Sequence, residues 1–472
     1  MKKRRLVSQL AIQYLPFADA ASAGFPLREV LRLSLFQISV GMATVLLLGT
    51  LNRVMIVELG VPAMMVAAMI ALPVLVAPLR AAIGFRSDTY RSAIGWKRVP
   101  FIWFGSLWQF GGLAIMPFAL LVLGGDTYHS FPFDGEILAA LAFIMTGWGI
   151  AMTQTAGLAL ASDRATDETR PRVVALLYVM FLVGMGLSSL VIGWFLQDFT
   201  PLKLIQVVQG AAVVTVLLNT AALWKQERVR PMSREERAAP RPAFRDAWAD
   251  FMAGGQAGRL IAVVALGTLA FNMQDVLLEP YGGEILGLSV SATTLLTAAW
   301  SFGALVAFAL SARWLAEGRD AFRMAATGIL FGIAAFSAVI FAAPLESAAL
   351  FFAGAAGIGF GGGLFAVATL TAAMTLPAQG SAGRGLALGA WGAAQATAAG
   401  IAIFAGGTIR DLVSATGLPE TLGPATGYSV VYHVEIALLF ATLAVLGPLV
   451  RLGTPRKPRS AQTGIGLADL PT

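Results

Sequence analysis

The 472-residue sequence has no cysteine, only two histidines, His129 and His433, and only 12% charged residues. The absence of cysteine excludes disulfides and thiolate metal ligands, and two imidazoles disfavour most metal-dependent enzymes. Soluble proteins are about 25% charged. Because 57% of the residues are hydrophobic, the chain has more apolar surface than a soluble domain can bury. The composition therefore indicates an integral membrane protein.

Twelve apolar stretches are long enough to cross a bilayer, which takes about 20 residues of helix. They lie near residues 34–56, 62–84, 99–123, 137–161, 172–196, 202–223, 259–281, 290–312, 322–343, 346–374, 383–407 and 429–450. The sequence predicts an all-α membrane protein with twelve transmembrane helices in two six-helix halves. The predicted units are an N-terminal segment (1–33), the first half (34–223), a linker (224–258), the second half (259–450) and a tail (451–472).

Basic residues predict the orientation, since loops rich in lysine and arginine stay on the cytoplasmic side. With twelve spans, 29 of the 33 lysines and arginines lie on the side of the two termini, and Lys203 and Arg410 lie on the other. Both termini are therefore expected in the cytoplasm. The net charge of +7 is explained by the basic residues that orient the chain in the membrane, and no nucleic-acid partner is expected. Residues 1–33 lack a signal-peptide pattern, so we expect them to be retained.

Residues 2–15 and 244–252 carry apolar side chains at helical spacing between charged ones. This pattern predicts two amphipathic helices on the cytoplasmic membrane surface. Each is interpreted either as a membrane-surface anchor that contacts lipid or as a docking face for a partner protein.

Arg53 is the most informative single residue, because a charge inside a span is costly unless it is paired or hydrated. Aligning the end of the first span with the end of the seventh sets Arg53 against Asp275, which predicts an ion pair between the halves. Neighbouring amides extend this into a central polar site consisting of Asn52, Arg53, Asn272, Gln274 and Asp275. The alternative is a structural ion pair, or an arginine that reaches the outer interface.

The loop after the second span contains a glycine, an acid and a basic cluster, namely Gly84, Asp88, Arg91, Lys97 and Arg98. This order resembles the signature loop of the major facilitator superfamily, although the spacing departs from it. Retention of basic residues on the cytoplasmic side explains the cluster equally well.

Two further motifs are attributed to structure. Gly357–Gly362 matches the dinucleotide-binding G-x-G-x-x-G, but it lies inside an apolar span and indicates close helix packing. Asp163 and Asp167 have the spacing of a diphosphate-binding motif, but the second acidic motif of such enzymes is missing, which favours a solvated loop.

Several longer strings are specific to one family. They are Tyr14–Ala20, Leu51–Pro62, Ile83–Asp88, Gly95–Pro100, Gln109–Gly112 and Phe271–Gly282. The sequence resembles the PucC/LhaA family of phototrophic bacteria, also called the bacteriochlorophyll delivery branch of the major facilitator superfamily, over residues 14–450.

The resemblance implies a major-facilitator-type fold in the bacterial inner, photosynthetic membrane. It also implies a non-enzymatic role in assembling light-harvesting antenna complexes, with antenna polypeptides as partners and bacteriochlorophyll as a transiently held pigment. Reaction centre–antenna assemblies and bacteriochlorophyll synthesis enzymes are further expected partners. The alternative function is secondary active transport of a porphyrin-like or other small substrate.

A chlorin magnesium takes an axial ligand, and the residues that could supply one are few. The candidates are Glu58, Glu279 and His433. The alternative for His433 is an ordinary residue at the membrane interface, and a pigment could also be held in an apolar groove without strong coordination.

Overall fold

A computed structural model describes residues 20–22, 24–75, 96, 98–124, 134–166, 169–227, 256–375, 384–416 and 418–450. Within these ranges eleven helices of 22 to 32 residues are long and apolar enough to cross a membrane. A shorter apolar helix, α5 (Ala63–Leu75), begins where the second span is predicted, and the rest of that span lies outside the described residues. The chain is thus an all-α, multi-pass membrane protein with the predicted twelve-span arrangement.

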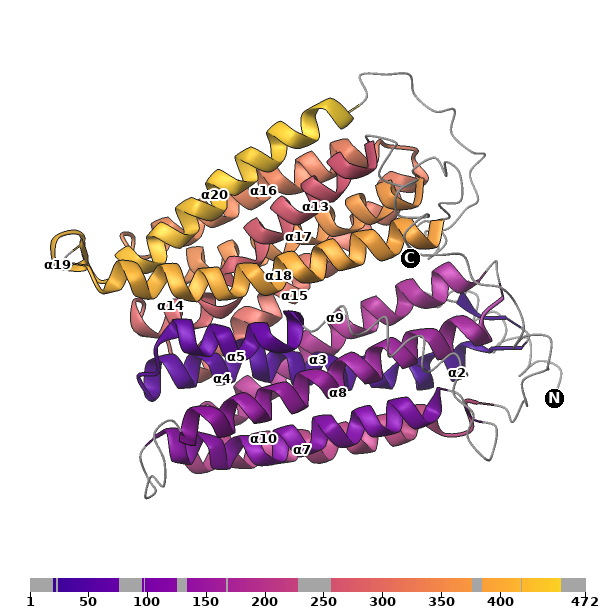
Figure 1. Cartoon of the computed structure of the whole chain (residues 1–472), viewed down its shortest axis with the longest axis horizontal. Helices are drawn as coiled ribbons and strands as arrows, with labels where there is room; N and C mark the ends of the chain where they lie inside the picture. The colour runs from indigo at the N-terminus through magenta and orange to yellow at the C-terminus, as the bar shows by residue number, and fades with distance from the viewer. Residues whose placement is uncertain are drawn as a thin grey trace, which may run out of the picture.

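The two halves lie one above the other in Figure 1, the first in indigo to magenta and the second in pink to yellow. The first half contains α2 (Leu27–Leu33), α3 (Leu35–Thr44), η2 (Val45–Thr50), α4 (Leu51–Arg53), η3 (Val54–Glu58), α5, α7 (Val99–Leu123), α8 (Asp134–Arg164), α9 (Arg170–Phe195) and α10 (Pro201–Leu223). The second contains α13 (Gln256–Asn272), η4 (Met273–Val276), α14 (Leu278–Glu284), α15 (Val290–Ala316), α16 (Ala321–Ala342), α17 (Ala348–Thr375), α18 (Arg384–Ser414), α19 (Leu418–Leu422), α20 (Thr426–Leu446) and η5 (Gly447–Leu449).

Local sequence explains where several spans begin. At three helix starts, the side-chain oxygen of the N-cap residue accepts a hydrogen bond from a backbone N–H of the first turn. The N-cap residues are Thr200 before α10 (3.2 Å), Ser289 before α15 (3.2 Å) and Asp320 before α16 (3.0 Å). Such caps satisfy N–H groups that a helix start leaves without partners. These three spans begin within one residue of their predicted starts, whereas the first helical run begins at Leu27 instead of residue 34.

Small residues bring neighbouring spans into backbone contact. Gly328 of α16 and Gly361 of α17 face each other, and a Cβ at either would lie 2.6 Å from the other's carbonyl oxygen. Gly359 of the same span lies against the backbone of Trp300 in α15. The glycine motif at Gly357–Gly362 is therefore a packing surface inside α17, as predicted from its apolar setting.

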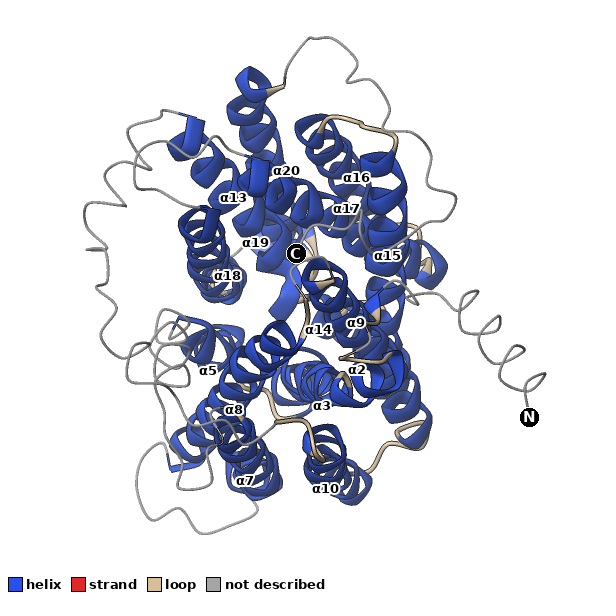
Figure 2. Cartoon of the chain, turned by 90° about the vertical axis from the view of Figure 1, so that its right-hand side faces the viewer, coloured by secondary structure: helices blue, strands red, loops and turns tan. Residues whose placement is uncertain are grey.

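The halves meet along two helix pairs, α5 with α18 and α9 with α15. Figures 1 and 2 show both pairs side by side at the junction between the halves. Large apolar side chains also remain on the outside of the bundle, as expected for surfaces that face lipid, among them Phe118, Leu217, Phe302 and Leu330. The predicted surface helices at 2–15 and 244–252 lie outside the described residues, so they stay predictions.

Candidate functional site

The first and seventh spans both depart from regular α-helix at the positions that the sequence alignment pairs. In the first span, π-helical turns at η2 and η3 flank the short α4. In the seventh, the 3-10 turn η4 separates α13 from α14. Polar side chains occupy both breaks, and such side chains compete with the backbone for hydrogen bonds. The irregular backbone and the polar residues therefore share one location.

A polar contact zone between the halves, here called the seam, forms where these breaks meet. Asn52 donates to the backbone carbonyl of Asp275 at 3.3 Å, and it also donates to Leu48 of its own helix. Thr50 of η2 and Thr294 of α15 are both fully buried, with their hydroxyl oxygens 3.1 Å apart. The alignment sets Asn52 against Gln274, and the structure brings Asn52 to the backbone of the next residue, Asp275.

Glu279 completes the seam, and Gly49 makes room for it. Glu279 is only 4% exposed and accepts a hydrogen bond from the Thr297 hydroxyl at 2.7 Å. A Cβ at Gly49 would collide with Glu279 Oε1 and lie 3.1 Å from Thr297 Oγ1. Only glycine at this position lets the carboxylate lie against the backbone of the opposite half. The second oxygen, Oε2, is buried and has no hydrogen-bond partner.

The ion pair predicted between Arg53 and Asp275 is wrong. Arg53 instead pairs with Glu58 and donates to the carbonyl of Leu288 at 3.3 Å. The π-helical turn explains this choice, because Leu59 N–H bonds to the carbonyl of Val54, five residues earlier. A π turn brings residues five apart together, so Glu58 lies over Arg53.

The surroundings of Arg53 keep its guanidinium buried beside Glu58. Its guanidinium lies against the backbone of Gly283, where a Cβ would be 3.0 Å from Arg53 Nε. Only 4% of Arg53 is exposed, whereas 39% of the Glu58 side chain is. Arg53 is therefore a buried cation held by a carboxylate near one end of the bundle, as in the structural alternative.

The carboxylate of Asp275 accepts hydrogen bonds from two amides of its own turn. Asn272 donates to its Oδ2 at 2.8 Å, and Gln274 donates to its Oδ1. The amides that the sequence placed in a central polar site thus bind the aspartate of the same helix. Gln274 also offers its backbone N–H to Glu435 of α20 at 2.7 Å.

The three candidate pigment ligands do not share one site. Glu58 is engaged by Arg53, and Glu279 lies in the seam. His433 is exposed on α20, and its Nδ1 lies 2.7 Å from the carbonyl oxygen of Ser429. A carbonyl only accepts, so Nδ1 carries the proton of this bond and the other ring nitrogen, Nε2, keeps its lone pair in the neutral ring.

Of the facilitator-like loop, the structure describes only Arg98 among the predicted residues, since Gly84, Asp88, Arg91 and Lys97 lie outside the described ranges. Arg98 Nε lies 3.0 Å from Asp163 at the end of α8, and its backbone N–H donates to Glu227 at 3.0 Å. Arg98 therefore joins α7, α8 and the start of the linker. Asp163, predicted in a solvated loop, forms part of this connection.

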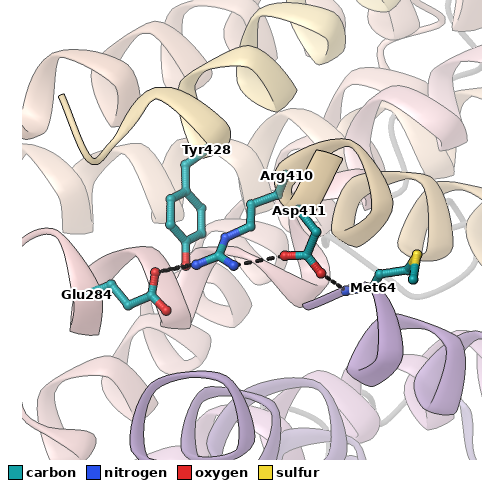
Figure 3. Close-up of polar contacts among 5 residues, drawn as sticks. All are labelled: Met64, Glu284, Arg410, Asp411 and Tyr428. Atoms are coloured by element: carbon teal, nitrogen blue, oxygen red, sulfur yellow. Dashed lines mark hydrogen bonds and ion pairs between the residues drawn. The ribbon is translucent and has the colours of Figure 1, made fainter. Parts of the chain in front are cut away.

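A second inter-half contact, here called the latch, consists of Met64, Glu284, Arg410, Asp411 and Tyr428 (Figure 3). Arg410 donates to Glu284 at 2.6 Å and to Asp411 at 2.8 Å, and its guanidinium lies 4.9 Å from the centre of the Tyr428 ring. Tyr428 also donates to Glu284 at 2.7 Å. Asp411 in turn accepts the backbone N–H of Met64 at 2.6 Å.

The latch caps α5 from the other half of the molecule. The residues before α5, Gly60–Pro62, have no side-chain oxygen that could cap the helix start. Asp411 supplies the missing carboxylate, whose charge also suits the positive end of a helix dipole. The halves are thus fastened at the seam and at the latch, both near the end where α5 begins.

Sequence reasoning missed Thr294, Thr297, Glu435 and the latch. The signal for Glu435 was present, because it is an acid in the middle of an apolar span, as Arg53 is a base in one. Arg410 also stood out as one of only two basic residues on its side of the predicted topology. The two threonines carry no comparable signal, since threonine is common in transmembrane helices.

Comparison with known sequences gives matches over nearly the whole chain. The family described as "PUCC protein" matches residues 50–454. A Rhodobacter capsulatus protein described as "Uncharacterized protein in puhA-bchM intergenic region" is 62% identical, with 99% of both chains covered. "Protein PucC" of Rhodovulum sulfidophilum is 53% identical over 86% of this chain and 90% of its own. The "Bacteriochlorophyll synthase 44.5 kDa chain" of Rhodobacter capsulatus is 31% identical over 91% and 97%.

Solved structures with a similar fold are transporters. A bacterial homologue of the human lysosomal transporter Spinster, in an inward-facing and unoccupied conformation, has a TM-score of 0.64 at 15% identity and covers 89% of this chain and 95% of its own. The nucleoside transporter NupG has a TM-score of 0.61 at 13% identity, covering 89% of this chain and 99% of its own. At these identities the likeness concerns the fold, which is of the major facilitator type.

Proposed function

Since the chain belongs to the PUCC protein family, we propose that it is a non-enzymatic assembly factor for light-harvesting antenna complexes in the inner, photosynthetic membrane of a bacterium. The observation that carries this proposal is the likeness to PUCC relatives along nearly the entire chain, including one described as part of bacteriochlorophyll synthase. In this proposal both termini are cytoplasmic. The chain binds nascent antenna polypeptides and hands them bacteriochlorophyll.

The exposed face of α7 supports binding of a partner helix. Trp103, Phe104, Trp108 and Phe118 are all exposed on this span. Tryptophan usually lies at the membrane–water interface, where its N–H reaches water. Trp108, however, is 43% exposed near the middle of α7. We take this aromatic face as the surface that receives an antenna helix.

His433 supports transient pigment binding, because its Nε2 has the lone pair that an axial magnesium ligand needs. Its exposed position on α20 gives a pigment access from the lipid phase. The proposal thus assigns the polypeptide and the pigment to outer surfaces of the bundle, in place of a central transport site. Reaction centre–antenna assemblies and bacteriochlorophyll synthesis enzymes are the further partners that we propose.

Co-purification of affinity-tagged protein from mildly solubilised membranes tests the partner surface. We expect antenna polypeptides to co-purify with the wild type and to be depleted several-fold with Trp108→Leu, which keeps the site apolar. Trp194→Leu is the matched control, because Trp194 is exposed at the end of α9, where an interfacial tryptophan is usual. Equal recovery of antenna polypeptides with Trp108→Leu would contradict the assignment of this surface.

Secondary active transport is a second candidate function, favoured by the fold and by two carboxylates near the seam between the halves. Coupled transport needs a titratable group at such a position, and Asp275 and Glu279 are available. Uptake of a porphyrin-like substrate into proteoliposomes, abolished by Asp275→Asn, would support transport. No uptake across tetrapyrroles and common metabolites would count against it.

A further inference from the structure

Inside the second half, several buried oxygen atoms without hydrogen-bond partners belong to residues of α20 and of the break in the seventh span. Glu435 of α20 is fully buried, and its Oε1 accepts the backbone N–H of Gln274 at 2.7 Å. This bond places the whole carboxyl group at the break, yet its other oxygen, Oε2, has no partner. Gln274 Oε1 and the Tyr432 hydroxyl are also buried without partners. Tyr432 and Glu435 are three residues apart on α20, so they share one face.

The charged side chains at this break, Glu435 and Asp275, are both acidic. Asp275 adds a second carboxylate beside Gln274, and the break lies between the end of α13 at Asn272 and the start of α14 at Leu278. Glu435 forms no ion pair with any basic side chain that the structure describes. Buried acceptors without donors are costly in a membrane, and a buried carboxylate is more so. The cluster therefore lacks a positively charged partner.

We propose that the break in the seventh span binds a monovalent metal cation such as Na⁺, with Glu435 Oε2, Gln274 Oε1 and the Tyr432 hydroxyl as ligands. Oxygen donors suit hard cations, and helix breaks with free carbonyls hold coupling ions in several transporter folds. A divalent ion is a poorer match, because no group of three or more His, Cys, Asp or Glu side chains in the described ranges is placed to hold a metal. The site does not depend on the antenna-assembly proposal.

The cation would fasten two elements of the second half. Glu435 and Tyr432 lie on α20, whereas Gln274 lies in η4, the turn that also carries Asp275 to the seam. Binding would stabilise the broken backbone and with it the contact between Asp275 and Asn52. Ion occupancy is thereby linked to the junction of the two halves.

Binding of radioactive sodium to the purified full chain tests the site. We expect saturable binding to the wild type, competed by unlabelled NaCl, and a higher unfolding midpoint in NaCl than in choline chloride at equal ionic strength. Glu435→Gln is expected to lose both effects. Glu420→Gln, at an exposed acid in α19, is the control and should keep both.

Tyr432→Phe removes only the hydroxyl, so it weakens sodium binding without leaving a cavity, and it keeps the test decisive if Glu435→Gln does not fold. Wild-type protein that shows no saturable sodium binding would overturn the proposal. Stability that responds to pH but equally to sodium and choline would assign a proton to the cluster and would also overturn it. Unchanged sodium binding in both variants would place the cation elsewhere and refute this site.

Discussion

At the scale of single residues, the bilayer tolerates Arg53 because its guanidinium is paired with a carboxylate near one end of the bundle. A charged side chain at the centre of a transmembrane helix costs about 3 kcal/mol in insertion experiments. Arg53 lies near one end of the bundle, where Glu58 pairs with it and the Leu288 carbonyl accepts its hydrogen bond. The pairing depends on a π-helical turn, so we expect Arg53 to be coupled in stability to Glu58 of its own span.

A double-mutant cycle measures that pairing. Arg53→Gln and Glu58→Gln should each lower the free energy of unfolding in mixed micelles, and the double variant should lose less than the sum by about 1 kcal/mol. The modest value follows from the exposure of the Glu58 side chain. In the matched cycle of Arg53→Gln with Asp275→Asn the losses should add. Coupling in the second cycle and additivity in the first would restore the pair predicted from sequence.

Gly49 is the residue on which the closeness of the seam depends. Gly49→Ala places a methyl group against the Glu279 carboxylate and the Thr297 hydroxyl, and we expect it to cost about 1 to 3 kcal/mol of stability. Gly210→Ala is the control, since nothing lies within 4 Å of a Cβ at that position in α10. The control should be neutral or should gain up to about 1 kcal/mol from helix propensity. Equal unfolding midpoints for the two variants would refute the packing role of Gly49.

At the scale of elements, side chains of one half form hydrogen bonds with backbone groups of the other half. Asn52 of the first span donates a hydrogen bond to the backbone of η4, and Asp411 of α18 accepts one from the backbone at the start of α5. An intra-helix cap survives any movement of its helix, whereas a cap from the other half is lost when the halves separate. The latch therefore couples the end of α5 to the relative position of the halves.

Asp411→Ala removes the cap of α5 and one acceptor of Arg410, which should let the halves separate at this end. Because the chain has no cysteine, spin labels can be attached at Leu202→Cys and Leu422→Cys, two exposed positions in different halves, without removing native thiols. We expect Asp411→Ala to shift the distance distribution between the labels to longer values. Asp198→Ala, at an exposed acid that precedes α10, should leave it unchanged. An unaltered distribution in Asp411→Ala would show that the latch does not hold the halves.

At the scale of the whole molecule, the fold was predictable because hydrophobicity and loop charge vary over about 20 residues, a length set by the bilayer. Aligning the two halves set Asn52 against Gln274, one residue from the Asp275 carbonyl to which Asn52 donates. The partner of Arg53 could not be predicted in this way. A π turn brings together residues five apart instead of four apart, and the amino-acid composition does not indicate where such a turn occurs. The latch joins Glu284 to Arg410 across 126 residues, a pairing that one sequence does not encode visibly.

The family and the fold rest on comparisons with known proteins, whereas the function is proposed from particular surfaces. Relatives across the whole chain place it in the PUCC family, and solved structures of similar fold are transporters. In this architecture, the contacts of the seam and the latch hold the two halves together. In the assembly role that we propose, the exposed aromatic face of α7 receives the antenna helix and His433 on α20 binds the pigment.

Deletion of the gene, with complementation in trans, tests the central claim most directly. Absorption spectra of membranes and pigment extraction should show an antenna complex strongly depleted while bacteriochlorophyll synthesis continues, and the wild-type gene should restore the complex. A complementing copy with Trp108→Leu should restore it poorly, whereas one with Trp194→Leu should restore it fully. Antenna levels unchanged by the deletion, or lost only in proportion to a loss of pigment, would contradict the role of an assembly factor.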